Sequence, residues 1–370
     1  MRKYLLSSIA LLSVVTTSAQ ENSTNLIIGT YTNSCESKGI YVYDFNVQTA
    51  EVKLKATSEK GINPSYLTVS EEAKYIYSVN ENGPKSMISA FALDSKSGAM
   101  QLLNQQDAKG ADPCYIINDK KNVITAAYSG GSISVFGKES DGGITPAKQV
   151  ILHKGKSINT QRQESSHVHM VQFSPDKKFV LANDLGTDKI YIYKYNPNAE
   201  AKILEIKDSI SVKAGSGPRH LTFSKDGKNS YLLQELDGSV TVFRYKKGTL
   251  IKIQETQVVD TDFKGQISAA DIHISPNGKF VYATNRGTAN TISCFEIQKD
   301  GHLKLVETSA TLGKGPRNFV IDPTGKFLLV AHQYSNNVVI FKIDSTTGKL
   351  TDSGKRIELC APVCLVFTKM

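Results

Sequence analysis

The chain repeats one order of apolar runs and polar turns along most of its length. A short apolar run meets a turn such as Ser-Pro-Asp or Asp-Pro-Thr-Gly, in which Pro, Asp and Gly supply the turn dihedrals. A second apolar run ends in a polar loop, and a third alternates apolar and polar residues, as in SVTVFRYK and NVVIFKI. With a less regular fourth run, each unit predicts four short β-strands.

The units follow one another at a nearly constant interval. Their first runs align at residues 64, 113, 168, 218, 269, 316 and 362, so the units are 46 to 55 residues apart. Four strands in about 50 residues are typical of a β-propeller blade. The last unit has only one run, PVCLVFTKM, and NLIIGTYT from Asn25 and GIYVYDFN from Gly39 match a second and third run. We predict an all-β, seven-bladed β-propeller with four-stranded antiparallel blades, its last blade closed by both N- and C-terminal strands.

The first 19 residues have the pattern of a secretory signal peptide. A basic start, Arg2 and Lys3, precedes an apolar stretch from Tyr4 to Val15 and a small-residue cleavage site ending at Ala19. The alternative is an N-terminal core strand or helix. We predict a signal peptide at residues 1–19, a single propeller domain at residues 20–370, and export as a periplasmic or secreted protein. No cysteine follows the apolar stretch at a lipoprotein-like position, so we expect no membrane anchor.

Charge and cysteine content narrow the choice of partners. The chain has 44 Lys and Arg against 35 Asp and Glu, a formal net charge of +9. Because the lysines are spread along the chain and form no basic stripe interleaved with aromatics, we expect no nucleic-acid partner. Export permits disulfides, and we expect mostly buried free thiols with room for one bridge among Cys35, Cys114, Cys294, Cys360 and Cys364. Closure of the ring uses up the sheet edges, which favours a monomer.

Polar residues recur at two aligned positions that a propeller brings to one mouth of its channel. Three of the seven residues at the second position of the first strand are basic: Ser65, Cys114, His169, Arg219, Ala270, Arg317 and Val363. After the second strand the chain reads Asn80-Glu81, Ser129-Gly130, Asp184-Leu185, Gln234-Glu235, Asn285-Arg286 and His332-Gln333. We expect these side chains to converge, with Arg219 and Glu235 contributed by one blade. The alternative is a wet rim whose polar groups hold water or pair with one another.

Three long segments carry a family resemblance. They are SHVHMVQFSPDKKFVLANDLGTDKIYIYKYN, GSGPRHLTFSKDGKNSYLLQELDGSVTVF and AADIHISPNGKFVYATNRGTANTISCFEI. They resemble the lactonase family of seven-bladed propellers, which includes propeller-type 6-phosphogluconolactonases and fungal carboxymuconate lactonizing enzymes. The likeness runs from LIIGTYT to APVCLVF, nearly the whole chain after the signal peptide. The export signal departs from members that act on sugar phosphates in the cytosol.

The resemblance implies a site of one His, two Arg and one Glu near the channel. The matching residues are His169 in HVH, Arg219 in GPRH, Glu235 in QEL and Arg286 in TNRG, and these four are the predicted catalytic residues. The residues predicted to bind substrate are His167, Glu81, Asp184, Arg317 and Gln333.

Opening a lactone needs an activated water, charge stabilisation on the carbonyl oxygen and a proton for the leaving alkoxide. We expect Glu235 or His169 to be the general acid or base, and Arg219 and Arg286 to stabilise the oxyanion or anchor an anionic substrate. No Gly-x-Ser-x-Gly motif is present. His167 and His169 could share one strand face toward a metal, but a third ligand is not evident, so no metal or other cofactor is predicted.

The predicted function is therefore an exported lactonase whose small-molecule substrate is an aldono- or 6-phosphoglucono-lactone. Two alternatives remain open. One is a muconate-type lactonizing cycloisomerase, and the other is a periplasmic propeller that binds a ligand or protein without catalysis.

Overall fold

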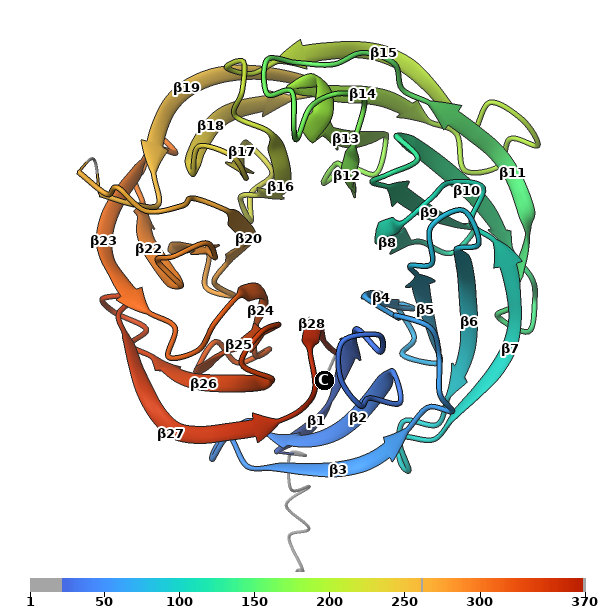
Figure 1. The fold of residues 1–370 in the computed structure, drawn as a ribbon, viewed down its shortest axis with the longest axis horizontal. Coiled ribbons are helices and arrows are strands. Elements are labelled where there is room, and N and C mark those ends of the chain that lie inside the picture. Colours follow the sequence, from blue (N-terminus) through green and yellow to red (C-terminus); the bar gives the residue numbers. More distant parts are fainter. Residues whose placement is uncertain (1–21, 261, 369–370) are drawn as a thin grey trace, which may run out of the picture.

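The computed structural model describes residues 22–260 and 262–368, and the predicted signal peptide at residues 1–19 lies outside them. In this part of the chain, seven four-stranded antiparallel sheets stand around a common axis (Figure 1). One short 3-10 helix, η1 (Leu185–Thr187), interrupts the strands. Among the described residues, no helix has the length and apolar character needed to cross a bilayer.

Six blades each consist of four consecutive strands. The first strand of a blade lies nearest the axis and the fourth lies at the outside of the ring. Their bounds are β4 (Tyr66–Val69), β5 (Tyr75–Asn80), β6 (Met87–Leu93) and β7 (Met100–Asp107); β8 (Pro113–Asn118), β9 (Asn122–Ala127), β10 (Ser132–Lys138) and β11 (Ile144–Leu152); β12 (Val168–Phe173), β13 (Phe179–Asp184), β14 (Lys189–Tyr195) and β15 (Leu204–Ser211). The next three blades contain β16 (Pro218–Phe223), β17 (Asn229–Gln234), β18 (Ser239–Lys246) and β19 (Thr249–Gln257); β20 (Ala269–Ile274), β21 (Phe280–Asn285), β22 (Thr291–Ile297) and β23 (Leu303–Ala310); β24 (Pro316–Ile321), β25 (Phe327–His332), β26 (Asn337–Ile343) and β27 (Leu350–Glu358).

The seventh blade joins the two ends of the chain, as predicted. Its strand order is β28 (Pro362–Phe367), β1 (Ser23–Thr30), β2 (Ile40–Asn46) and β3 (Val52–Thr57). In Figure 1 the red strand β28 lies on the axial side of the blue strand β1, and the two pair antiparallel with Leu26 opposite Phe367. The pairing continues past the strand, because the Thr24 hydroxyl donates to the carbonyl of Thr368 at 3.0 Å.

Burial along the strands follows from the stacking of one blade against the next. A middle strand such as β21, FVYATN, is buried on both faces because neighbouring blades cover both. An outer strand such as β11 alternates between half-buried and exposed residues, since its outward face meets solvent. The apolar clusters accordingly bridge adjacent blades, and Tyr231 and Val242 of one blade pack with Val281 and Phe295 of the next.

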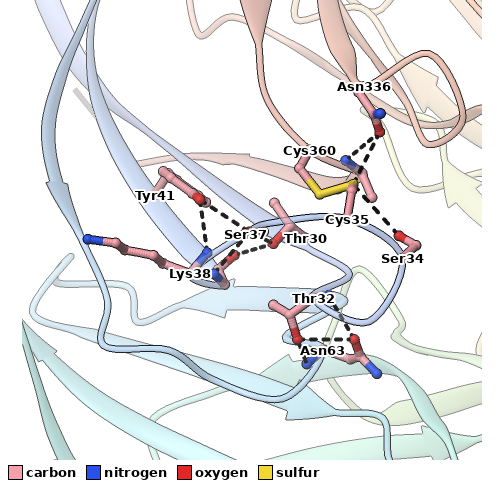
Figure 2. The surroundings of a disulfide bond; sticks show 12 residues. Thr30, Thr32, Ser34, Cys35, Ser37, Lys38, Tyr41, Asn63, Asn336 and Cys360 are labelled. Carbon is pink, nitrogen blue, oxygen red and sulfur yellow. Dashed lines mark hydrogen bonds between the residues drawn. A yellow bond between two sulfur atoms is a disulfide. The ribbon is translucent and has the colours of Figure 1, made fainter.

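A disulfide fastens the closing blade. It joins Cys35, in the loop after β1, to Cys360, just before β28, across 325 residues of sequence (Figure 2). The remaining cysteines within the described residues are buried free thiols, so the expected pattern of one bridge and buried thiols is confirmed. Disulfides persist in oxidising compartments, and the bond is therefore typical of an extracytoplasmic protein.

Candidate active site

β-Bulges aim the polar residues of the inner strands. The register between the first and second strands shifts at the second position of the first strand, which leaves His169, Arg219 and Arg317 outside the regular ladder. The same shift occurs at Cys114 in β8 and at Val363 in β28. A bulge places an extra residue in one strand and redirects its side chain. This local distortion explains how a strand buried among apolar neighbours can present a charged side chain at the mouth of the ring.

The residue directly after the second strand is the other recurring position. In all seven blades its backbone N–H bonds, at 2.8 to 3.2 Å, to the carbonyl just before the aligned start of the first strand. The seven residues so placed are Tyr31, Glu81, Tyr128, Leu185, Glu235, Arg286 and Gln333. The repeated hydrogen bond brings this position and the bulged position of the same blade together at one rim.

These two positions build a polar cavity of about 430 Å³. Its lining residues are Glu81, Asp112, Cys114, Tyr128, Ser129, Arg162, His169, Glu235, Ser268, Arg286, Arg317 and Tyr334. Of the residues predicted from sequence, the structure thus brings together His169, Glu235, Arg286, Glu81 and Arg317. Arg219 lies behind this lining, 2% exposed, with its Nε donating to Glu235 at 2.9 Å.

Asp184 does not line the cavity, although the sequence suggested it as a substrate contact. It is the last residue of β13, one position before the rim residue Leu185, and successive strand residues point to opposite faces. Its buried carboxylate accepts hydrogen bonds from the Ser166 hydroxyl at 2.7 Å and from the backbone of His167 at 2.8 Å, and it pairs with His153 at 3.0 Å. The hydrogen bonds of this carboxylate are therefore made to groups inside the protein and not to the cavity.

His167 and Gln333 also lie outside the cavity lining. The His167 ring stacks on Tyr128 at 4.4 Å and bonds to Glu164 at 3.1 Å, so it supports a lining residue from behind. Gln333 occupies the rim position of its blade, but its neighbour Tyr334 is the residue that lines the cavity. Within the described residues, no three His, Cys, Asp or Glu side chains are placed to hold a metal ion.

Glu235 is the centre of a cluster of positive charge. Its Oε2 lies 2.9 Å from Arg219 and 3.1 Å from Arg286, and its Oε1 lies 2.6 Å from Arg162. Burial alone would raise the pKa of this carboxyl, but Arg286, Arg219 and Arg162 together lower it to about 2. Glu235 therefore remains ionised at any ordinary pH and holds the three guanidinium groups in place.

His169 sits beside this cluster in its neutral form. Burial, reinforced by the charges of Arg219 and Arg317, holds the pKa of the imidazole well below its usual range. The ring packs edge-on against Tyr128 and His220, and its Nδ1 has no hydrogen-bond partner within the described part of the chain. Buried polar nitrogens normally have a hydrogen-bond partner, so this unpaired atom is an exception in the site.

The opposite side of the cavity has a different character. The Tyr31 hydroxyl donates to both carboxylate oxygens of Glu81, at 3.1 and 3.3 Å, and the Ser65 hydroxyl donates to Oε1. Burial raises the pKa of Glu81, against the lowering effects of Arg317 and the two hydroxyls. Arg317 lies over the Tyr31 ring at 5.4 Å from its centroid, and no described residue forms an ion pair or hydrogen bond with its guanidinium.

Sequence reasoning missed several contributors to this site, and Arg162 and Tyr31 are the ones that contact its carboxylates. Arg162 lies in the segment 153–167 between β11 and β12, which is tied down by a bond from Gln163 to the carbonyl of Leu185 at 2.8 Å. The signal for Arg162 was the spacing, because 55 residues separate the aligned starts at 113 and 168 and the extra length lies at the rim. Tyr31 is the seventh residue of the run NLIIGTYT and directly follows β1, at the same rim position as Glu81 and Glu235.

Known proteins share both the sequence and the fold of this chain. The family model described as "Lactonase, 7-bladed beta-propeller" matches residues 25–367. A Formosa agariphila protein named 6-phosphogluconolactonase is 39% identical over 332 residues, covering 88% of this chain and 94% of the relative. A crystal structure from Bacteroides fragilis is 43% identical with a TM-score of 0.91, covering 95% of this chain and 99% of that one. The Pseudomonas aeruginosa periplasmic gluconolactonase PpgL is 33% identical with a TM-score of 0.89, covering 94% and 99%. The chain belongs to the lactonase family of seven-bladed β-propellers.

Proposed function

We propose that this protein is an exported lactonase that hydrolyses an aldono- or 6-phosphoglucono-lactone in the rim cavity. The relative named 6-phosphogluconolactonase and the solved periplasmic gluconolactonase support the reaction class. The disulfide between Cys35 and Cys360 supports the location outside the cytoplasm. A volume of about 430 Å³ lies within the usual range for sites that bind small molecules.

The observation that carries the proposal is the charge of the cavity. Three lining arginines, together with Arg219 behind them, face three carboxylates. Three of these guanidiniums share Glu235, whereas Arg317 forms no ion pair or hydrogen bond with a described residue and feels Glu81 only through its charge. A guanidinium is permanently charged and presents a rigid fork of donors that fits a carboxylate or phosphate. Arg317 is therefore the proposed anchor for the anionic group of the substrate or product.

The same charges favour the transition state of lactone opening. Water attacks the carbonyl carbon, and the negative charge that develops on the carbonyl oxygen needs fixed donors in a site that excludes bulk water. Arg286 lines the cavity and is held in place by Glu235, so it is the proposed oxyanion partner, with Arg219 behind it. His169 lines the cavity and is the proposed hydrogen-bond partner for a hydroxyl of the sugar.

An assay of acid release tests the proposal. A pH indicator follows the hydrolysis of δ-gluconolactone and of its 6-phosphate above the uncatalysed rate, for the wild type, Arg286→Ala and Arg317→Met. We expect Arg286→Ala to lower kcat by 10²- to 10³-fold, the order found for lost oxyanion donors. Arg317→Met should mainly raise KM, most strongly for the more anionic substrate.

The matched control is Arg356→Ala, an arginine of the outer strand β27 that pairs with Asp352 away from the cavity. It should hydrolyse lactones like the wild type. Absence of acid release from every lactone would contradict the proposal and favour a propeller that only binds. A change in ultraviolet absorbance with muconates would identify the cycloisomerase instead.

A further inference from the structure

Glu81 and Glu235 are equivalent in the repeat, but their carboxylates are prepared for different tasks. Both directly follow the second strand of a blade and both line the cavity. Glu235 contacts three guanidiniums, whereas Glu81 accepts hydrogen bonds only from the neutral hydroxyls of Tyr31 and Ser65. A proton transferred to Glu235 would leave three positive charges around a neutral group, whereas a proton transferred to Glu81 breaks no ion pair.

We propose that Glu81 is the general base that activates the attacking water, and that Tyr31 and Ser65 orient its carboxylate. The inference rests on the proposed lactonase function. It changes the role assigned to Glu81 from a substrate contact to a catalytic residue. It also makes Glu235 a positioning residue for the arginines.

The proton balance of the reaction is complete with this one carboxylate. Glu81 takes a proton from water while the water oxygen bonds to the carbonyl carbon of the lactone. The tetrahedral intermediate then collapses, the bond between the carbonyl carbon and the ring oxygen breaks, and the ring oxygen receives the proton from Glu81. The product is the open hydroxy acid, and Glu81 returns to its ionised form.

The hydrogen bonds around Glu81 leave room for this role. Oε1 accepts from both Ser65 and Tyr31, whereas Oε2 receives only the longer contact of 3.3 Å from Tyr31. Oε2 therefore has a lone pair available for water. The charge of Arg317 lowers the pKa of Glu81, although no ion pair or hydrogen bond joins the two side chains.

Within residues 22–260 and 262–368, few charged or titratable groups face Glu81. Burial raises the pKa of Glu81 and Asp112 adds to the effect, while Arg317 and the bonds from Ser65 and Tyr31 oppose it. Cys114, also in the cavity lining, has its pKa raised to about 12 by burial and is neutral. A base whose pKa lies closer to the working pH accepts a proton more readily than Glu235, whose pKa is about 2.

The test compares Glu81→Gln with Glu235→Gln by their kcat, KM and pH–rate profiles on δ-gluconolactone. We expect Glu81→Gln to lower kcat by 10²- to 10⁴-fold, the range for general-base catalysis, with KM within about threefold of the wild type. The acid limb of the kcat/KM profile, which reports the base, should disappear in this variant. Glu51→Gln, an exposed glutamate before β3, is the matched control and should keep wild-type kinetics.

A second variant probes the base without removing it. Tyr31→Phe deletes a hydrogen bond that lowers the pKa of Glu81, so the pKa should rise and the acid limb should move to higher pH. The plateau rate above that limb should fall as well, because the carboxylate loses a group that orients it. A purely structural role for Tyr31 would reduce the rate at all pH values and leave the limb in place.

The outcomes separate the two proposals. If the wild type hydrolyses no lactone, the proposed function fails. If the wild type is active and Glu81→Gln keeps its kcat and its acid limb, only the role of Glu81 is overturned. Should Glu81→Gln not fold, as judged by circular dichroism, the acid limb of Tyr31→Phe decides the question.

Discussion

Two halves of one cavity use the same residue type in opposite ways. On one side Glu235 is surrounded by Arg162, Arg219 and Arg286 at 2.6 to 3.1 Å, and on the other side Glu81 meets only hydroxyls at hydrogen-bond distance. The repeat places both glutamates at the same point of a blade. Part of the difference comes from the aligned position before or in the first strand of the same blade, which is Arg219 beside Glu235 and Ser65 beside Glu81. The rest comes from Arg162 and Arg286, which belong to the rim segment before β12 and to the next blade.

The largest expected effect is a difference between Glu235→Gln and Glu81→Gln in the free energy of unfolding. Glu235→Gln removes the anion that compensates the buried Arg219, and breaking a buried ion pair costs about 3–5 kcal/mol. Glu81→Gln removes no ion pair, and burial already disfavours the charged form of Glu81, so this variant should cost less. Urea unfolding of both variants measures the free energies. Equal losses would show that the two halves do not differ as described.

The effect of Glu235 should also depend on pH. The pKa of this carboxyl is about 2 in the folded protein, below its ordinary value, so its stabilisation is present above the ordinary value and is lost as the pH falls toward 2. The stability gap between the wild type and Glu235→Gln should narrow over that window. For Glu81, whose pKa is raised, the wild type should instead gain stability relative to Glu81→Gln as the pH falls. Unfolding curves at several acidic pH values measure both stability differences from the wild type. If the two differences change in the same direction as the pH falls, the contrast between the carboxylates is wrong.

The next largest effect should come from removing the disulfide, which lies on the Glu81 side of the cavity. The loop that carries Cys35 also carries Tyr31, whose N–H donates to the carbonyl of Ala361 beside Cys360. Replacing both cysteines with serine should cost about 2–4 kcal/mol, the usual value for a native disulfide. Thermal unfolding checks the loss. Arg286 and Glu235 lie in other blades, so product binding there should be unchanged, and a weakened oxyanion site would contradict the division of the cavity.

The smallest of these effects concerns Asp184. Its carboxylate bonds inside the protein, and hydrogen bonds to a charged group contribute about 1.5–3 kcal/mol, so Asp184→Asn should destabilise the fold by about that amount. Lactone hydrolysis by the folded variant should remain close to the wild-type rate. A loss of kcat as large as that of Glu81→Gln would return Asp184 to the active site.

The fold could be predicted from the sequence because the information is repeated seven times. The predicted starts at 113, 168, 218, 269, 316 and 362 coincide with the first residues of β8, β12, β16, β20, β24 and β28. The turn residues Pro, Asp and Gly mark each unit, and the incomplete last unit indicates closure by the N-terminal strands. Register follows from side-chain alternation in strands that bury one face and expose the other, such as β11.

The site was harder to predict from the sequence, because it depends on contacts between residues that are far apart in the chain. Arg219 and Glu235 could be placed in one blade, but the three-arginine cluster required Arg162, from a rim segment outside the repeat. Asp184 was expected at the rim, but the rim position of its blade is the next residue, Leu185. The sequence does not show at which residue the strand pairing ends and the rim turn begins. The pairing of Cys35 with Cys360 depends on ring closure, which brings together residues that lie near the two ends of the chain.

The seam between the chain ends also forms part of the cavity. Tyr31 directly follows β1, its backbone N–H donates to the carbonyl of Ala361 just before β28, and its hydroxyl donates to Glu81. A nascent chain that lacks β28 cannot hold Tyr31 in this position, so hydrolysis should begin only after translation of the whole chain. In a circular permutant with new termini in a distant outer strand, β1 and β28 would be adjacent parts of one continuous segment. Tyr31 could then be held in place before the last residues are translated, so activity should appear earlier during synthesis.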